Sequence, residues 1–139
     1  MADEDSIDEQ PRFKLPVARR FEELEVWKQS RILTRRIYEI VNLPSFARDF
    51  GLADQMKRSA VSIMANIAEG FERRNTGEFS QFLRYSPASC AELRSHLYIA
   101  SDLGYLSEKS FGECIESAEE IRRLLNALIT SLKPWTESI

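Results

Sequence analysis

A row of polar side chains along one expected helix is the strongest chemical signal in this sequence. The stretch "VSIMANIAEGFERR" and the residues just before it carry polar residues at steps of 4, 3, 4 and 3, which is one line of a helix. The row consists of Gln55, Ser59, Ser62, Asn66 and Glu69. A second row, with steps of 3 and 4, consists of Ser89, Glu92 and His96. Side chains of these types form hydrogen-bond networks when they are paired.

We interpret the two rows as faces that meet each other, or meet a neighbouring subunit, and form hydrogen bonds there. A buried amide or carboxylate is costly unless it is paired, so a complete network would fix the register of the helices. Plain exposure of both rows to solvent is the alternative. A catalytic pairing of Asn66 with Glu69 is disfavoured.

A stripe of basic residues on the first expected helix is the candidate for binding nucleic acid. It consists of Lys28, Arg31, Arg35 and, beside them, Arg36. Only Lys28 has a preceding carboxylate in reach, Glu25, and only Arg35 has a following one, Glu39. An under-compensated stripe of this kind is suited to RNA phosphates. Solvation of the face, or pairing across a subunit boundary, is the alternative interpretation.

No set of residues with the spacing of a catalytic or metal site is found. A di-iron bundle needs two Glu-x-x-His units, but the chain has one histidine, and Glu92 precedes His96 by four residues rather than three. Cys90 and Cys114 are far apart and are expected to be small buried thiols. A glycine-rich phosphate loop and a nucleophile–base arrangement are also missing. We therefore predict no enzyme, no metal, no cofactor and no small-molecule substrate.

Carboxylates of the last expected helix could instead hold magnesium, as in a nucleotide pyrophosphatase. Glu113, Glu116 and Glu120 lie on one side of that helix. However, Glu119 and Glu120 are followed by Arg122 and Arg123, so pairing along the helix explains them better. A solvated face is the favoured interpretation.

Four amphipathic helices are expected to position all of these residues. Apolar residues at alternating steps of 3 and 4 predict helices near 22–41, 52–71, 76–100 and 108–133, and no strand alternation is present. The third pattern continues in phase through Pro87, which indicates one kinked helix rather than two. Pro134 is expected to close the fourth. These patterns predict an all-α fold. Short connections between the helices favour an antiparallel up-down four-helix bundle.

The domain organisation is expected to be simple. We predict a mobile N-terminal arm at 1–20, the four-helix bundle at 21–133 and a C-terminal tail at 134–139. The first eleven residues carry five acidic and no basic residues, so the remainder has 19 basic and 22 − 5 = 17 acidic residues, a net charge of +2. The bulk charge therefore does not indicate nucleic-acid binding. The acidic arm is a candidate to fold over the basic stripe and compete there with phosphate.

The expected location is the cytoplasm. The sequence holds no apolar run of about 18 residues, so no membrane span is predicted. Its start, "MADEDSIDEQ", is acidic and lacks the apolar core of a signal peptide.

The stretch "FGLADQMKRSAVSIMANIAEGFERR" resembles the pattern "YGL-Q-RRA-SI-NIAEG--R" of the bacterial 23S ribosomal RNA intervening-sequence proteins. The matching residues are Phe50, Gly51, Leu52, Gln55, Lys57, Arg58, Ser59, Ser62, Ile63, Asn66, Ile67, Ala68, Glu69, Gly70 and Arg73. The segments "FEELEVWKQS" and "IRRLLNALITSLK" also match, so the resemblance covers about residues 20–133.

This resemblance implies a four-helix bundle that assembles into a ring, most commonly a pentamer. It also implies a link to RNA, because genes of such proteins lie in insertions within 23S ribosomal RNA genes. We therefore expect a non-enzymatic homo-oligomer that binds structured RNA or an RNA–protein assembly. The alternative is a protein–protein interaction scaffold with no nucleic-acid role.

Overall fold

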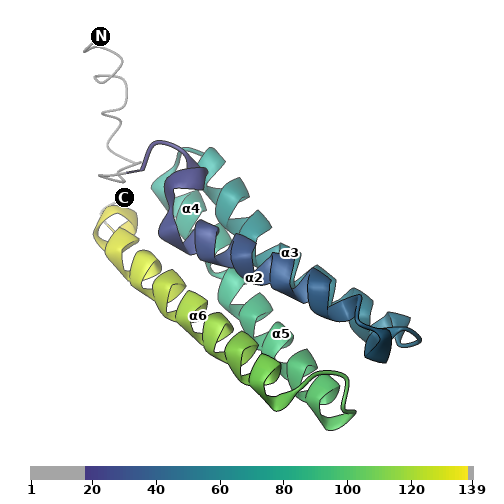
Figure 1. The fold of residues 1–139 in the computed structure, drawn as a ribbon. Coiled ribbons are helices and arrows are strands. Elements are labelled where there is room, and N and C mark those ends of the chain that lie inside the picture. The colour runs from purple at the N-terminus through teal and green to yellow at the C-terminus, as the bar shows by residue number, and fades with distance from the viewer. Residues whose placement is uncertain (1–17, 138–139) are drawn as a thin grey trace.

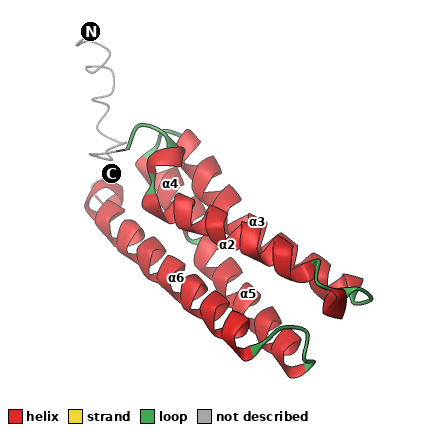
Figure 2. Ribbon diagram, viewed as in Figure 1, coloured by secondary structure: helices red, strands yellow, loops and turns green. Residues whose placement is uncertain are grey.

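Helices make up nearly all of the chain that the structure describes. The computed structural model describes residues 18–137, with side chains up to Pro134, and forms five α-helices within that range. They are α2 (Glu25–Val41), α3 (Phe50–Glu72), α4 (Thr76–Leu83), α5 (Tyr85–Asp102) and α6 (Glu108–Glu137). Two 3-10 turns, η1 (Phe21–Glu23) and η2 (Pro44–Phe46), flank α2. Residues 18–137 contain no strand (Figure 2), so the all-α prediction is confirmed.

The helices pack side by side as four rods, because α4 and α5 follow one another and form a single rod (Figure 1). The α3 helix contacts α2, α4 and α5, while α6 contacts α2, α4 and α5. The Thr34 hydroxyl of α2 is shared between the carbonyl of Ser30 at 2.8 Å and the carbonyl of Ala60 in α3 at 3.1 Å. The Ser86 hydroxyl of α5 likewise donates to the carbonyl of Ile63 at 2.9 Å. The two bonds to α3 fix its middle between its neighbours.

One apolar core runs along the inside of the rods. Its centre is built from residues such as Leu33 of α2, Ile63 of α3, Leu93 of α5 and Leu125 of α6, each almost fully buried. The residues at steps of 4, 3, 4 and 3 along α2 are all buried: Val26, Ser30, Leu33, Ile37 and Ile40. Each rod thus contributes one stripe to a common interior, and burial of these stripes provides the main stabilisation of the fold.

The helix ends follow the local sequence signals. Asn75 caps α4, because its side chain accepts the backbone N–H of Glu78 at 2.9 Å. Gly104 follows α5 with φ 75°, the left-handed conformation that glycine adopts readily. The hydroxyl of Ser107 accepts the N–H of Ser110 at 3.1 Å and caps α6. At each of these three positions the residue type is one that favours a helix end.

A clasp joins the two inter-helix connections at one end of the bundle. Asp49 caps α3 through Leu52, and its other carboxylate oxygen accepts the hydroxyl of Tyr105 at 2.9 Å. This hydrogen bond raises the pKa of Tyr105. The Tyr105 ring packs on Phe46 at 4.8 Å between centroids, and the hydroxyl of Ser45 donates to the carbonyl of Tyr105. The clasp therefore ties the α2–α3 connection to the α5–α6 connection.

Several boundaries differ from the prediction, and the α2 helix begins at Glu25 rather than near residue 22. The third rod is divided at Arg84 into α4 and α5, although Arg84 keeps helical dihedral angles (φ −71°, ψ −16°). The cause is Pro87, which has no N–H to donate to the carbonyl four residues earlier, in the last turn of α4. The apolar phase nevertheless continues across the division, from Leu83 to Cys90.

The predicted boundaries at the chain ends were also wrong where the structure describes them. The α6 helix continues through Pro134 to Glu137, because proline removes only its own backbone bond so close to a helix end. At the other end, Ala18 is buried and the backbone N–H of Arg19 donates to Glu23 at 2.9 Å, so residues 18–20 belong to the bundle. The rest of the predicted arm, with its acidic residues, and the tail beyond residue 137 lie outside the described residues.

The closest approach of α3 to α4 depends on Gly70. A Cβ atom at this position would lie 2.6 Å from the Cβ of Phe82 and 3.1 Å from the Cδ1 of Phe79. The Cβ of Phe82 is fixed to its backbone, so it cannot rotate away. The Phe79 ring packs edge-on against Phe71 of α3 at 5.6 Å, and this aromatic contact therefore requires glycine at position 70.

We predict that Gly70→Ala destabilises the protein by about 1–3 kcal/mol, because α3 and α4 must move apart. Gly112→Ala is the matched control: Gly112 lies in α6 with nothing within 4 Å of its Cβ position. This control should stabilise the protein by about 0.5–1 kcal/mol. Chemical denaturation of both variants measures the difference, and equal effects would contradict the close approach.

Candidate functional site

A short seam of polar side chains joins α3 to α5. The hydroxyl of Ser89 donates to the hydroxyl oxygen of Ser62 at 2.9 Å. The side-chain amide of Asn66 donates to the carbonyl of Ser62 at 2.9 Å and to its hydroxyl oxygen at 3.1 Å. The structure therefore brings Ser62 and Asn66 of the first predicted row together with Ser89 of the second. We call Ser62, Asn66, Ser86 and Ser89 the polar seam.

The remaining members of the two rows do not join this network. Ser59 is buried but bonds to the carbonyl of Gln55 within its own helix, at 2.9 Å. Glu69 is exposed and pairs with Arg73 at 3.6 Å. Gln55 and Glu92 are also exposed. His96 is half-buried, and its Nε2 is shielded from solvent without a hydrogen-bond partner in the described structure.

The geometry of a helix explains why the first row divides. A step of four residues turns the chain 40° beyond a full circle, so alternating steps of 4 and 3 zigzag about a line. Ser59 and Asn66 therefore lie on the more buried side of the row, while Gln55 and Glu69 are exposed to solvent. Ser62 lies on the outer side of the zigzag but is reached by Ser89 across the seam.

A basic face covers the outer side of α2 and α3. From the predicted stripe it takes Lys28, Arg31 and Arg35, all exposed. The structure adds Lys57 and Arg58 of α3 to the same face. Two of these five cations are paired: Arg35 with Glu39 at 3.7 Å, and Arg58 with Asp54 at 2.9 Å. The hydrogen bond from Arg58 to Asp54 raises the pKa of Arg58.

The other three cations of the basic face make no ion pair within the described residues. The guanidinium of Arg31 lies over the ring of Trp27 at 5.7 Å from its centroid. The ammonium of Lys57 lies over the ring of Tyr38 at 5.6 Å. Lys28 is exposed, and Glu25 is engaged by Gln29 at 2.7 Å instead. These cations are thus available to an anionic partner.

Arg36 has a different environment from the rest of the predicted stripe. Its guanidinium donates to Glu113 of α6 at 3.0 Å and to Ser110 at 3.2 Å. The hydrogen bond to Glu113 raises the pKa of Arg36. Arg36 therefore links α2 to α6 rather than pointing away with its neighbours on the helix.

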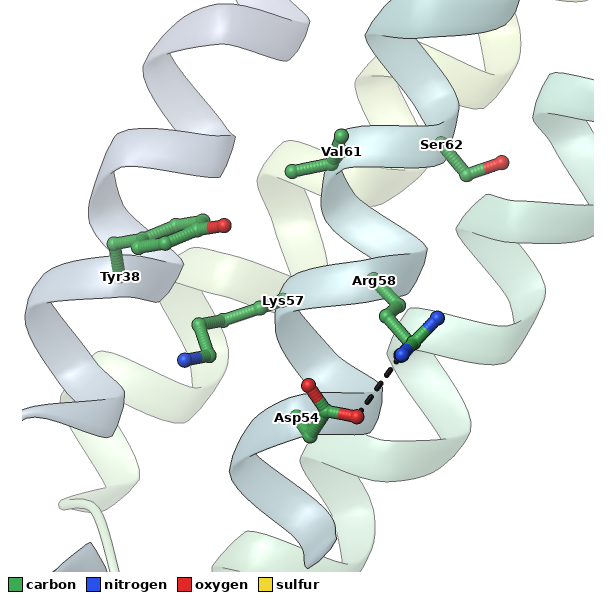
Figure 3. Close-up of a pocket in the computed structure, with 6 residues that line it drawn as sticks. All are labelled: Tyr38, Asp54, Lys57, Arg58, Val61 and Ser62. Atoms are coloured by element: carbon green, nitrogen blue, oxygen red, sulfur yellow. Dashed lines mark hydrogen bonds and ion pairs between the residues drawn. The ribbon is translucent and has the colours of Figure 1, made fainter. Parts of the chain in front are cut away.

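A shallow depression of ≈ 430 Å³ crosses the basic face (Figure 3). It is lined by Tyr38, Asp54, Lys57, Arg58, Val61 and Ser62. Tyr38 reaches into it from α2, and the other five residues belong to α3. The depression thus combines an aromatic ring with cations and with one member of the polar seam.

Three carboxylates of α6, those of Glu113, Glu119 and Glu120, are held in ion pairs, whereas Glu116 is exposed. Glu119 pairs with Arg94 of α5 and with Arg122 at 2.9 Å, and the hydrogen bond from Arg122 lowers the pKa of Glu119. Glu120 pairs with Arg123 at 2.7 Å, so the predicted pairing along this helix is confirmed. Among the described residues, no three His, Cys, Asp or Glu side chains gather closely enough to hold a metal ion.

The two thiols are unsuited to chemistry at neutral pH. Cys90 and Cys114 are free and buried, as the sequence predicts. Burial raises the pKa of Cys90 to about 12 and also raises the pKa of Cys114. Both therefore remain protonated, and a protonated thiol is neither a nucleophile nor a metal ligand.

Sequence reasoning missed Tyr38, Lys57 and Arg58 as parts of one surface. Arg31, Arg35 and Tyr38 are separated by steps of 4 and then 3 residues, so the sequence alone could have shown that they share one helix face. The contribution of α3 depends on how α3 lies against α2, and a helical pattern within one segment does not contain that information.

These observations define a class: an all-helical bundle protein with a cationic outer face and a small polar seam. A sequence model of the 23S rRNA-intervening sequence protein family matches residues 22–127. The chain belongs to this family, as its resemblance indicated.

A solved structure supports the fold. The chain is similar to the crystal structure of a protein of unknown function from the S23 ribosomal protein family of Bacteroides thetaiotaomicron, with a TM-score of 0.68 and 23% identity. The match covers 75% of this chain and 97% of the other. No functionally curated protein matches this chain significantly. Within the part of the chain that the structure describes, no helix is long and apolar enough to cross a membrane.

We predict that Ser62 and Ser89 are energetically coupled across the seam. Each Ser→Ala change alone should leave a polar partner unsatisfied, while the double variant should cost less than the sum, by about 0.5–1.5 kcal/mol. The hydroxyl of Ser131 bonds only within α6, to the carbonyl of Leu128 at 2.7 Å, so it supplies the control. A double-mutant cycle of Ser62 with Ser131 should show no coupling, and equal coupling in the two cycles would contradict a seam bond.

Proposed function

We propose that the protein is a non-enzymatic homo-oligomer that binds structured RNA, alone or within an RNA–protein assembly, through the basic face. The observation that carries this proposal is that three cations of the basic face, Lys28, Arg31 and Lys57, have no ion-pair partner among the described residues. Phosphate is the natural counter-charge for cations presented in this way.

The distribution of charge supports this role better than the total does. The chain has a formal net charge of −3, yet Arg94, Arg122 and Arg123 are satisfied by carboxylates on the α5–α6 side. Lys28, Arg31 and Lys57, which make no ion pair among the described residues, lie on the α2–α3 side instead. A local field of this kind attracts polyanions even when the whole chain is nearly neutral or acidic.

Catalysis is not part of the proposal. Glu113, Glu119 and Glu120 of α6 are engaged in ion pairs, and burial raises the pKa of both thiols, so they stay protonated. The proposed RNA role places the protein in the bacterial cytoplasm, where ribosomal RNA is found.

Assembly into a ring, most simply a pentamer, completes the proposal, with each subunit an antiparallel up-down bundle. A surface on α5 supports assembly: the row of Ser89, Glu92 and His96 continues at steps of 3 and 4 to Ile99 and Leu103. These two side chains are 48% and 54% exposed. Exposed apolar neighbours of this kind are typical of interfaces between subunits. A ring would repeat the basic face in every subunit, so weak single contacts would add through multivalency.

We predict that the native mass, measured by light scattering, is a multiple of the 16.1 kDa chain mass. Changing both Ile99 and Leu103 to Glu should reduce it to a single chain, because each interface would then bury unpaired charges. Ile32→Glu is the control, since Ile32 is 61% exposed but lies on α2. A wild-type monomer would contradict the assembly, and dissociation by Ile32→Glu alone would move the interface to α2.

We predict salt-sensitive RNA binding that depends on the unpaired cations. Changing Lys28, Arg31 and Lys57 together to Gln should weaken binding and reduce the slope of log K against log salt by about 2–3, one phosphate contact per cation. The charge-matched control changes Arg20, Lys109 and Arg123, which are paired with Glu23, Glu113 and Glu120. Gel shifts between about 50 and 200 mM salt measure both variants.

A protein–protein scaffold with no nucleic-acid role is the second candidate, and other exposed apolar side chains, such as Ile32 at 61% and Phe50 at 77%, favour it. The salt titration separates the two functions. If the wild-type protein binds no RNA at low salt, or if the control triple variant weakens binding as strongly as the basic-face variant, the RNA function is wrong and the scaffold remains.

A further inference from the structure

The depression on the basic face has the form of a stacking site. Tyr38 is 43% exposed and extends from α2 towards α3. Figure 3 shows its ring nearly edge-on, with the ammonium of Lys57 on one side and Val61 towards the other. Val61 follows Lys57 by one turn of α3 and is 39% exposed. One side of the ring is therefore covered by a cation, and Val61 lines the depression towards its other side.

The charges around this space select the kind of ligand. Arg58 and Asp54 are 2.9 Å apart and largely cancel each other. Lys57 has no carboxylate partner within the described residues, so the depression keeps one net positive charge beside an exposed aromatic ring. A flat ring that carries a phosphate satisfies both features, whereas a purely apolar ligand would leave Lys57 unused.

We propose that this depression holds an unpaired RNA base, stacked on Tyr38 on the side of Val61, while the adjoining phosphate lies against Lys57. This inference rests on the proposed RNA function and names the feature of the RNA that is recognised. Stacking on an aromatic side chain accepts any base, because every base has a π-face. Recognition therefore depends on unpaired nucleotides, such as those of loops and bulges, rather than on sequence.

A double helix does not fit this site. Its bases are stacked on one another, so a duplex offers the basic face only phosphates and ribose hydroxyls. A duplex would still contact Lys28 and Arg31, but Tyr38 would remain unused. The site thus predicts a preference for single-stranded RNA over duplex RNA of the same length.

The test uses the full chain and fluorescence anisotropy with two labelled probes, a single-stranded uridine oligomer and a blunt duplex of equal length. The wild-type protein should bind the single strand more tightly. Tyr38→Leu should weaken single-strand binding by about 5- to 100-fold, the loss of one stacked base, and change duplex binding less than about twofold. Tyr38→Phe, which keeps the ring, should bind like the wild type. Melting temperatures confirm that both variants fold.

A crosslinking measurement does not depend on any variant. A 4-thiouridine oligomer irradiated with the wild-type protein should crosslink to the peptides that contain Tyr38 or Val61. Equal affinity for the two probes, an unchanged affinity of Tyr38→Leu, or crosslinks confined to other helices would each overturn the stacking site while leaving the RNA function intact. No binding of either probe at tens of micromolar would instead overturn the RNA function, and the stacking site with it.

Discussion

The close contact of α3 with the third rod is the constraint on which the other features depend. At one end, Gly70 lets the aromatic side chains of α4 approach the α3 backbone. In the middle, Ser86 and Ser89 reach α3 through hydrogen bonds rather than through bulky side chains. Small residues at these points set the rotation of α3 about its axis. That rotation turns Lys57 and Arg58 outwards, beside α2, and so creates the basic face.

The two sides of the bundle treat charge in opposite ways. On the α5–α6 side, arginines and glutamates neutralise each other, partly between helices, as Arg94 does with Glu119. On the α2–α3 side, Arg31 and Lys57 lie over aromatic rings instead. A cation over an aromatic ring has no anion beside it to compensate its positive charge, whereas the charges of an ion pair largely cancel at a distance. The overall acidity of the chain is therefore a poor guide to its binding properties.

The apolar periodicity was sufficient to predict the four rods, because each rod buries one stripe and the 3–4 spacing records which residues lie on it. Details that depend on a single backbone bond were not predictable in this way, as the division before Pro87 and the continuation through Pro134 show. The candidate site was predicted only in part. The face of Lys28 and Arg31 follows from helical spacing, but the neighbourhood of Tyr38 and Lys57 requires two helices to be placed against each other.

The clasp between Asp49 and Tyr105 has a consequence for the order of folding. These residues are 56 positions apart, so their hydrogen bond closes a long segment of chain. Contacts between neighbouring helices in the sequence form with a smaller entropic cost and are favoured early. A bond made late is absent from the transition state, so it slows unfolding without speeding folding. We therefore expect the clasp to lower the unfolding rate and so to prolong the lifetime of the native bundle.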